Sequence, residues 1–307
     1  MPNVADNKQL TDGIKRLKQQ RNAIILSHVY QPPEIQEIAD FVGDSLELSR
    51  RAAATDADVI VFCGVHFMAE SAAILSPQKT VLLPEVSAGC PMADMVTVDA
   101  LRAQKARMPE ALVVCYVNTS AEVKAECDIV CTSANAVHVV ESMPADRPVL
   151  FVPDKNLGRY VAKQSGRTMH IWEGCCYVHD RLTADEVLKA KSEHPQALVL
   201  VHPECRPEVA ELADHVASTT GMLRFAKESG AREYIIATEK GILHQFNKQC
   251  PGKRFYPASD NLVCRDMKST TLEKVLNSLQ KLEPRVTVSA EIGDRALKCL
   301  ERMLAVQ

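Results

Sequence analysis

The sequence predicts an α/β protein of three homologous three-layer α/β/α lobes, with small parallel sheets arranged about a pseudo-threefold axis. The first observation is an internal repeat, because AIILSHVY (23–30) matches ALVVCYVN (111–118) and ALVLVHPE (197–204) at offsets of 88 and 86 residues. The second is that short apolar runs alternate with helical patterns, which is typical of parallel sheets covered on both faces. The third is a cysteine near the end of every repeat. A fixed period of this kind indicates repeated structural units.

Each repeat is predicted to begin with a buried strand and a short helix, after which a hydroxyl residue opens a second helix as its N-cap. These hydroxyl residues are Ser45, Ser133 and Thr219. A second strand, a further helix and a third strand follow before the cysteine, and the second strands are expected at 59–64, 149–154 and 234–239. Amphipathic helices at about 7–20 and 290–305 lie outside the repeat. We therefore expect lobe 1 with the N-terminal helix in 1–107, lobe 2 in 108–193 and lobe 3 with the C-terminal helix in 194–307.

The composition is that of an ordinary globular protein, with 46% hydrophobic and 24% charged residues. A net charge of −3 gives no reason to expect nucleic acid or an anionic membrane as a partner. No apolar run approaches the length of a membrane span or a signal peptide, so we expect a cytoplasmic protein. Most of the eleven cysteines are then expected to pack as small hydrophobic side chains. We assign Cys63, Cys115, Cys127, Cys131, Cys205, Cys250 and Cys299 to this group.

Polar residues follow the first strand of each repeat, where the carboxyl ends of parallel strands place ligand sites. They form three pairs spaced i, i+2: His28 with Tyr30, Tyr116 with Asn118, and His202 with Glu204. This spacing sends both side chains of a pair to the same side of an extended chain. If the lobes surround a threefold axis, the helix N-termini at Ser45, Ser133 and Thr219 also converge, and they would bind phosphate or carboxylate. We therefore expect a small anionic substrate.

The repeat-ending cysteines, Cys90, Cys176 and Cys264, are candidates for ligands of one shared metal centre. Cys176 is preferred over Cys175 because it lies 86 residues after Cys90 and 88 before Cys264, which matches the other offsets. Three thiolates can hold zinc or an iron–sulfur cluster. None of the three belongs to a CxxC pair, which argues against a structural zinc site. A cubane with three protein ligands leaves one iron open as a Lewis acid.

Over essentially its whole length the chain resembles the quinolinate synthase family of NAD biosynthesis. The resemblance is carried by ILSHVYQ, GDSLELSR, FCGVHFMAES, LPEVSAGCPMADM, YVNTSAEVKA, GCCYVHD, VHPEC, ASTTGM and CRDMKSTTLEKV. It implies three α/β lobes around a [4Fe–4S] cluster held by Cys90, Cys176 and Cys264. It also implies condensation of iminoaspartate with dihydroxyacetone phosphate to quinolinate, with loss of two waters and phosphate. Iminoaspartate would come from an aspartate-oxidising enzyme.

The resemblance also implies a substrate pocket lined by His28, Tyr30, Ser45, Tyr116, Asn118, Ser133, His202, Glu204 and Thr219. From their chemistry, Tyr30, His202 and Glu204 are expected to be catalytic: Glu204 with His202 moves protons, and Tyr30 acts as an acid or base. The remaining residues of the set are expected to bind substrate, with the hydroxyls and Asn118 holding carboxylate or phosphate oxygens. His179 lies either near the cluster or in the core. Many relatives have proline or another small residue after the third cysteine where this chain has Arg265, and some carry extra cysteines that are absent here.

Two alternatives stay open from the residues. One is another three-lobed, three-cysteine iron–sulfur enzyme of the diphthamide-synthesis type, which cleaves S-adenosylmethionine and needs a protein substrate. The other is a non-catalytic metabolite or redox sensor, which would bind a ligand without turnover. The YVNTS and VHPEC segments count against the first, and the net charge counts against a DNA-binding output for the second.

Overall fold

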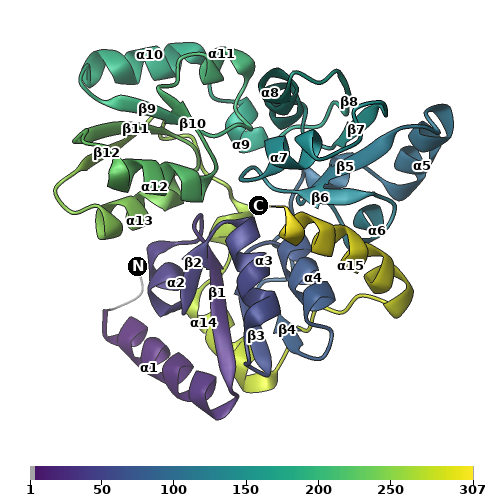
Figure 1. The fold of residues 1–307 in the computed structure, drawn as a ribbon. Coiled ribbons are helices and arrows are strands. Elements are labelled where there is room, and N and C mark those ends of the chain that lie inside the picture. Colours follow the sequence, from purple (N-terminus) through teal and green to yellow (C-terminus); the bar gives the residue numbers. More distant parts are fainter. Residues whose placement is uncertain (1–3, 307) are drawn as a thin grey trace.

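The computed structural model describes residues 4–306 and shows three α/β lobes around a common centre (Figure 1). Each lobe contains a four-stranded sheet in which all neighbouring strands are parallel. The strand orders are β2-β1-β3-β4, β6-β5-β7-β8 and β10-β9-β11-β12, so the chain winds in the same way three times. The predicted fold class is confirmed.

The strands are short, and most of their residues are buried, as expected for sheets covered by helices. In lobe 1 they are β1 (Ala23–His28), β2 (Phe41–Gly43), β3 (Val59–Cys63) and β4 (Thr80–Leu82). In lobe 2 they are β5 (Leu112–Tyr116), β6 (Ile129–Cys131), β7 (Val149–Val152) and β8 (Met169–Ile171). In lobe 3 they are β9 (Leu198–Val201), β10 (His215–Val216), β11 (Glu233–Ala237) and β12 (Arg254–Pro257). The edge strands β2, β6 and β10 are additional to those predicted from the sequence.

Helices occupy the connections between the strands and both ends of the described chain. Those up to residue 107 are α1 (Val4–Gln20), α2 (Pro33–Ile38), α3 (Ser45–Ala54), α4 (His66–Leu75), η1 (Ala93–Met95) and α5 (Val98–Arg107). The next are α6 (Ala121–Lys124), α7 (Ala136–Glu141), α8 (Lys155–Ser165), α9 (Tyr177–Asp180) and α10 (Ala184–Glu193). The last are α11 (Pro207–Ala210), α12 (Thr219–Glu228), η2 (Lys240–Ile242), α13 (Leu243–Gln249), η3 (Asp266–Lys268), α14 (Leu272–Lys281) and α15 (Ala290–Ala305). Within residues 4–306, none combines the length and apolar character of a membrane span.

An aspartate joins the edge strand of every lobe to the inner strand beside it in the same way. These residues are the ones directly before β2, β6 and β10, and they occupy the same place in the sequence repeat: Asp40, Asp128 and Asp214. Each carboxylate accepts a hydrogen bond from a backbone N–H of the lobe's first strand; the donors are Ile25, Val113 and Val199, at 2.8, 2.8 and 2.7 Å. The repeat therefore encodes a structural contact as well as a fold.

The hydroxyl residues predicted as helix N-caps lie one or two positions away from the caps. Ser45 and Thr219 are the first residues of α3 and α12, whose N-caps are Asp44 and Ser218, and Ser133 lies two residues before the N-cap of α7. The prediction was wrong because Asp44 is the better cap, since its carboxylate accepts from two backbone N–H groups. The Ser218 hydroxyl donates to Asp44 at 3.2 Å, which brings α3 and α12 together.

The C-terminal helices connect lobes rather than cover lobe 3. After Cys264 the chain returns to lobe 1, where α14 packs on α1, and α15 then packs on α4, α6 and β6 (Figure 1). The Cys299 thiol donates to the carbonyl oxygen of Cys127 at 2.8 Å, which ties α15 to lobe 2. Helices α5 and α10 pack on the lobes that follow them, and Leu101 of α5 shares a core cluster with Val113 of β5. The domain boundaries at 107 and 193 stay a prediction.

Candidate active site

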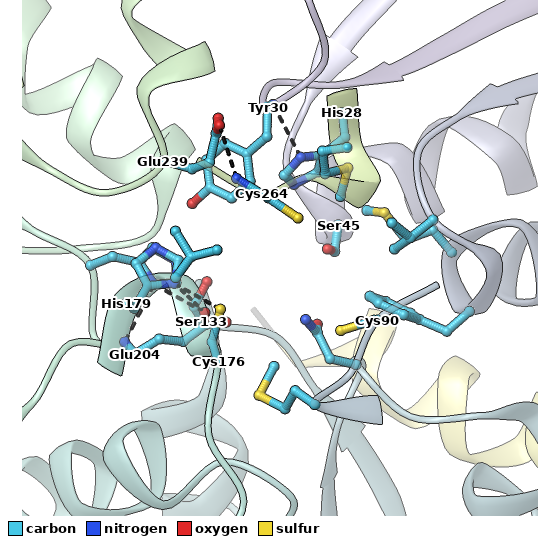
Figure 2. A pocket seen from close by; sticks show the side chains of 18 of the residues that line it. His28, Tyr30, Ser45, Cys90, Ser133, Cys176, His179, Glu204, Glu239 and Cys264 are labelled. Atoms are coloured by element: carbon cyan, nitrogen blue, oxygen red, sulfur yellow. Dashed lines mark hydrogen bonds and ion pairs between the residues drawn. The ribbon is translucent and has the colours of Figure 1, made fainter. Parts of the chain in front are cut away.

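A single cavity at the meeting point of the lobes is lined by every residue that the sequence singled out for the site. From the carboxyl ends of the first strands come His28, Tyr30, Tyr116, Asn118, His202 and Glu204; from the helix openings Ser45, Ser133 and Thr219; and from the repeat ends Cys90, Cys176 and Cys264. Figure 2 shows the side chains of His28, Tyr30, Ser45, Cys90, Ser133, Cys176, Glu204 and Cys264 around this common space. Of the adjacent cysteines, Cys176 lines the cavity, whereas the N–H of Cys175 donates outward to the Met95 sulfur at 3.3 Å.

The three cavity cysteines each lie after the fourth strand of a sheet, where a short helical turn begins. Cys90 precedes η1, Cys176 is the N-cap of α9, and Cys264 precedes η3. Burial raises the pKa of all three thiols, that of Cys90 to about 12. Backbone N–H groups of the following turn oppose this increase; they belong to Met92 and Ala93, to Val178 and His179, and to Met267.

The donor set fits a thiolate-bound metal centre. The three thiols are free and lie in one cavity although they are 86 and 88 residues apart in the chain. Negative charge on one thiolate disfavours ionisation of the others, as between Cys90 and Cys264, and a bound cation removes this repulsion. A second feature of the cavity is an unsatisfied polar atom, since Asn118 Oδ1 is buried without a hydrogen-bond partner among the described residues. Both features are those of a site that is completed by ligands. Of the other eight cysteines, the seven assigned to the core pack in or against it, as predicted; the eighth is Cys175.

Two of the cavity histidines have the same local geometry and the same ionisation. The Nδ1 atom of His28 accepts the backbone N–H of Tyr30 at 3.2 Å, and that of His202 accepts the N–H of Glu204 at 3.3 Å. Each imidazole is therefore held as the tautomer that carries its proton on Nε2. Burial lowers the pKa of both to about 3. At neutral pH both histidines are uncharged and can donate from Nε2 to a ligand in the cavity.

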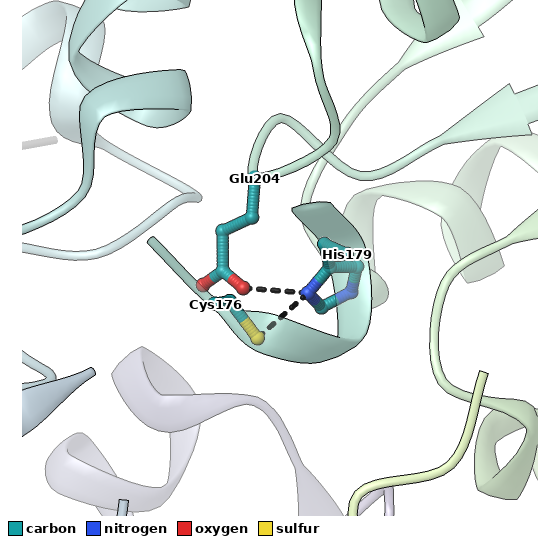
Figure 3. Close-up of side chains that lie close together, drawn as sticks. All are labelled: Cys176, His179 and Glu204. Carbon is teal, nitrogen blue, oxygen red and sulfur yellow. Dashed lines mark hydrogen bonds and ion pairs between the residues drawn. The ribbon is translucent and has the colours of Figure 1, made fainter. Parts of the chain in front are cut away.

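Glu204 is the centre of a buried hydrogen-bond network. One carboxylate oxygen lies 2.7 Å from His179 Nδ1 (Figure 3). The other oxygen accepts a short hydrogen bond from the Tyr116 hydroxyl. Burial opposes ionisation of this carboxyl, but the histidines beside it and the hydrogen bonds from His179 and Tyr116 outweigh this effect and lower its pKa. His202 Nδ1 lies 3.9 Å from the same oxygen, so His179, rather than His202, is the hydrogen-bonding partner.

The network continues from His179 through Thr238 to Tyr30, which follows the first strand of lobe 1. His179 Nε2 lies 2.8 Å from Thr238 Oγ1, which in turn lies 2.6 Å from the Tyr30 hydroxyl. Burial and the negative charge of Glu204 raise the pKa of Tyr30 and of Tyr116, so both phenols are neutral. One assignment satisfies every donor: Tyr30 donates to Thr238, Thr238 to His179, and His179 to Glu204.

His179 also lies close to a candidate cluster ligand. Its Nδ1 is 3.2 Å from the Cys176 sulfur, and the ligating atoms of Cys176, His179 and Glu204 all lie within 4.8 Å of one another (Figure 3). This trio has the composition of a single-ion site. However, both oxygens of Glu204 already accept hydrogen bonds, so its carboxylate is part of the hydrogen-bond network beside the cysteine site rather than a free metal ligand.

Sequence reasoning missed Thr238 and left His179 undecided. Thr238 follows β11, the strand next to β9, so it lies at the same carboxyl edge as the predicted residues. The equivalent residues of the other lobes are Gly64 and Pro153, so the repeat alone gave no reason to select it. The available signal was the topological rule that neighbouring strand ends share a site.

Comparison with known proteins gives a consistent result over nearly the whole chain. The family model described as "Quinolinate synthetase A protein" matches residues 12–305. A quinolinate synthase of Desulforudis audaxviator is 61% identical over 298 residues, covering 97% of this chain and 98% of the relative. A quinolinate synthase of Methanoregula boonei is 59% identical over 301 residues, covering 98% of this chain and 99% of the relative.

Proposed function

Because the chain belongs to the quinolinate synthetase A family, we propose that its central cavity condenses iminoaspartate with dihydroxyacetone phosphate to quinolinate. Two waters and one phosphate leave, which balances the atoms of the two substrates against the product. The observation that carries the proposal is that twelve residues selected from three repeats line one cavity. The function belongs to NAD biosynthesis, and an enzyme that oxidises aspartate would supply iminoaspartate.

We assign Cys90, Cys176 and Cys264 as the ligands of a [4Fe–4S] cluster. Their free thiols and their convergence on one cavity support this assignment, and a bound cationic cluster would provide the charge that ionises them. When bound, a cluster with three protein ligands supplies one open iron as a Lewis acid for a substrate oxygen.

The chain's own contribution to the two dehydrations is proton transfer by the two ends of the network, Glu204 and Tyr30. Loss of water requires a base that accepts a proton from the substrate and an acid that protonates the leaving hydroxyl. Glu204 is ionised because its pKa is lowered, and Tyr30 is a neutral phenol at the other end of the network. Every hydrogen bond of the assigned network points from Tyr30 toward Glu204, so Glu204 keeps the proton that it takes from the substrate while Tyr30 gives its own proton to the leaving hydroxyl. The water that is released returns a proton from Glu204 to Tyr30 and restores both groups.

The anionic groups of the substrates are assigned to the helix openings. Ser45 and Thr219 are the first residues of two ten-residue helices, whose N-terminal N–H groups and dipoles favour phosphate or carboxylate. Ser133 and Asn118 face the same cavity from lobe 2. The neutral His28 and His202 add donors that do not bring positive charge, so binding depends on directed hydrogen bonds.

The test is product formation by anaerobically purified protein. Incubation with iminoaspartate and dihydroxyacetone phosphate should give quinolinate by mass spectrometry, and omission of either substrate should abolish it. The same preparation should be incubated with S-adenosylmethionine. Cleavage of S-adenosylmethionine without quinolinate formation would favour the diphthamide-synthesis type of enzyme, and ligand binding without either reaction would favour a sensor.

A further inference from the structure

The three loops that carry the cavity cysteines are attached to their sheets by one repeated backbone contact. In each lobe a helix (α4, α8 or η2) begins just after the third strand. The residue that follows its N-cap donates its N–H to the carbonyl oxygen of the residue two positions before the cysteine. The donor and acceptor pairs are His66 with Ala88, Lys155 with Gly174, and Lys240 with Leu262, at 2.9, 2.8 and 2.9 Å. The pseudo-threefold repeat therefore extends to the main chain around the cysteines.

In lobes 2 and 3 the N-cap residue is a carboxylate that adds a second attachment. Asp154 Oδ2 accepts the backbone N–H of Cys176 at 3.2 Å. Glu239 Oε1 accepts the N–H of Cys264 at 3.3 Å (Figure 2). Both side chains have an exposed fraction of 0%, so water does not compete for these hydrogen bonds. The second oxygen of each carboxylate caps the helix or turn that follows. Each acidic residue thus joins a strand end, a helix start and a cysteine.

Lobe 1 lacks the second attachment. The equivalent N-cap of α4 is Val65, which is buried and has no side-chain acceptor. Its backbone contact remains, since His66 donates to Ala88 as in the other lobes. Cys90 is therefore held through one of the two attachments, whereas Cys176 and Cys264 are held through both.

We propose that Asp154 and Glu239 are positioning residues that fix Cys176 and Cys264 before the cluster binds, so that Cys90 completes a ligand set that is already two-thirds formed. The inference rests on the proposed function, in which these three cysteines hold the cluster. Both oxygens of each carboxylate already accept backbone N–H groups, so each residue acts on the main chain of a ligand and not as a ligand itself. Hydrogen-bonding partners that orient ligands typically change metal affinity by about 10–100-fold when they are substituted.

The test compares the variants Asp154→Ser and Glu239→Ser with the matched control Asp128→Ser. Serine keeps an oxygen for the helix cap but removes the acceptor for the cysteine N–H. Asp128 is a lobe 2 carboxylate that accepts a backbone N–H far along the chain from any cavity cysteine, so its variant reports general loss of stability. Two readouts apply: the rate at which a chelator removes iron from the anaerobic protein, and the affinity of the metal-free protein for Co²⁺, followed by thiolate-to-cobalt absorption.

We expect iron loss to be about tenfold faster, and Co²⁺ binding about tenfold weaker, in Asp154→Ser and Glu239→Ser, with the control close to the unsubstituted protein. Unchanged values in Asp154→Ser and Glu239→Ser, or an equal loss in the control Asp128→Ser, would overturn the positioning role. Glu239→Ser decides the question in lobe 3 if Asp154→Ser does not fold. Absence of iron and sulfide from the unsubstituted protein would contradict the proposed function instead, and the Co²⁺ affinities would still decide the positioning.

Discussion

Replacement of His28 and His202 by asparagine should flatten the pH dependence of stability. Both imidazoles are neutral in the folded protein because burial lowers their pKa to about 3, whereas an unfolded histidine titrates near 6.5. Between these values the unfolded chain binds more protons, so stability is fully present above about pH 6.5 and falls as the pH decreases. Each histidine contributes a slope of about 1.4 kcal/mol per pH unit, or about 2 kcal/mol between pH 6 and pH 4.5.

The assay is urea unfolding of the metal-free protein at several pH values between 4.5 and 7. Asparagine retains an oxygen that can accept the backbone N–H two residues later, so it replaces the Nδ1 contact without titrating. Each single variant should lose about 1.4 kcal/mol per pH unit of slope, and the double variant about twice that. The exposed His170→Asn is the control and should keep the full slope. Equal slopes in the double variant and the unsubstituted protein would refute the assignment of neutral, buried histidines.

Three further results are expected. Cys176→Ala should lose the iron and sulfide of the anaerobic protein while Cys175→Ala keeps them, because Cys176 alone of the pair lines the cavity; loss in the Cys175 variant only would contradict the repeat register. Glu204→Gln should keep the cluster and bind substrate but lose turnover by about 100-fold or more, since the proton acceptor is gone, and near-normal quinolinate formation would exclude Glu204 from the mechanism. Asp128→Ala should lower the free energy of unfolding by about 1–2 kcal/mol, because the N–H of Val113 loses its acceptor, and an unchanged urea midpoint would show that this strand contact contributes nothing measurable.

The sequence predicts those features that the three lobes share. The first strands, the polar pairs after them and the cavity cysteines recur at fixed offsets, and the carboxyl edge of a parallel sheet brings them together. Pairs such as His202 and Glu204 therefore line the cavity as expected. The edge strands β2, β6 and β10 were missed because two or three residues are too few to show a hydrophobic period.

Features that differ between the lobes, or that depend on contacts between distant segments, could not be predicted. Thr238, Tyr30 and His179 come from three separate parts of the chain, and Thr238 connects the other two by hydrogen bonds. Its equivalents Gly64 and Pro153 have no side-chain hydroxyl and cannot make this connection. The N-cap of α3 was misplaced because Ser45 and Asp44 are both good capping residues, and the geometry of the loop selects between them. The internal repeat thus predicts the fold and the residues common to the three lobes, whereas the hydrogen-bond network of the site depends on positions where the lobes differ.

The most direct test of the account is elemental analysis of anaerobically purified protein for iron, sulfide and zinc. The account predicts about four irons and four sulfides per chain, with no zinc, since three cysteines from three lobes hold one cubane cluster. One zinc per chain without iron would contradict the assigned chemistry, even though the three-lobed fold and its central cavity would remain.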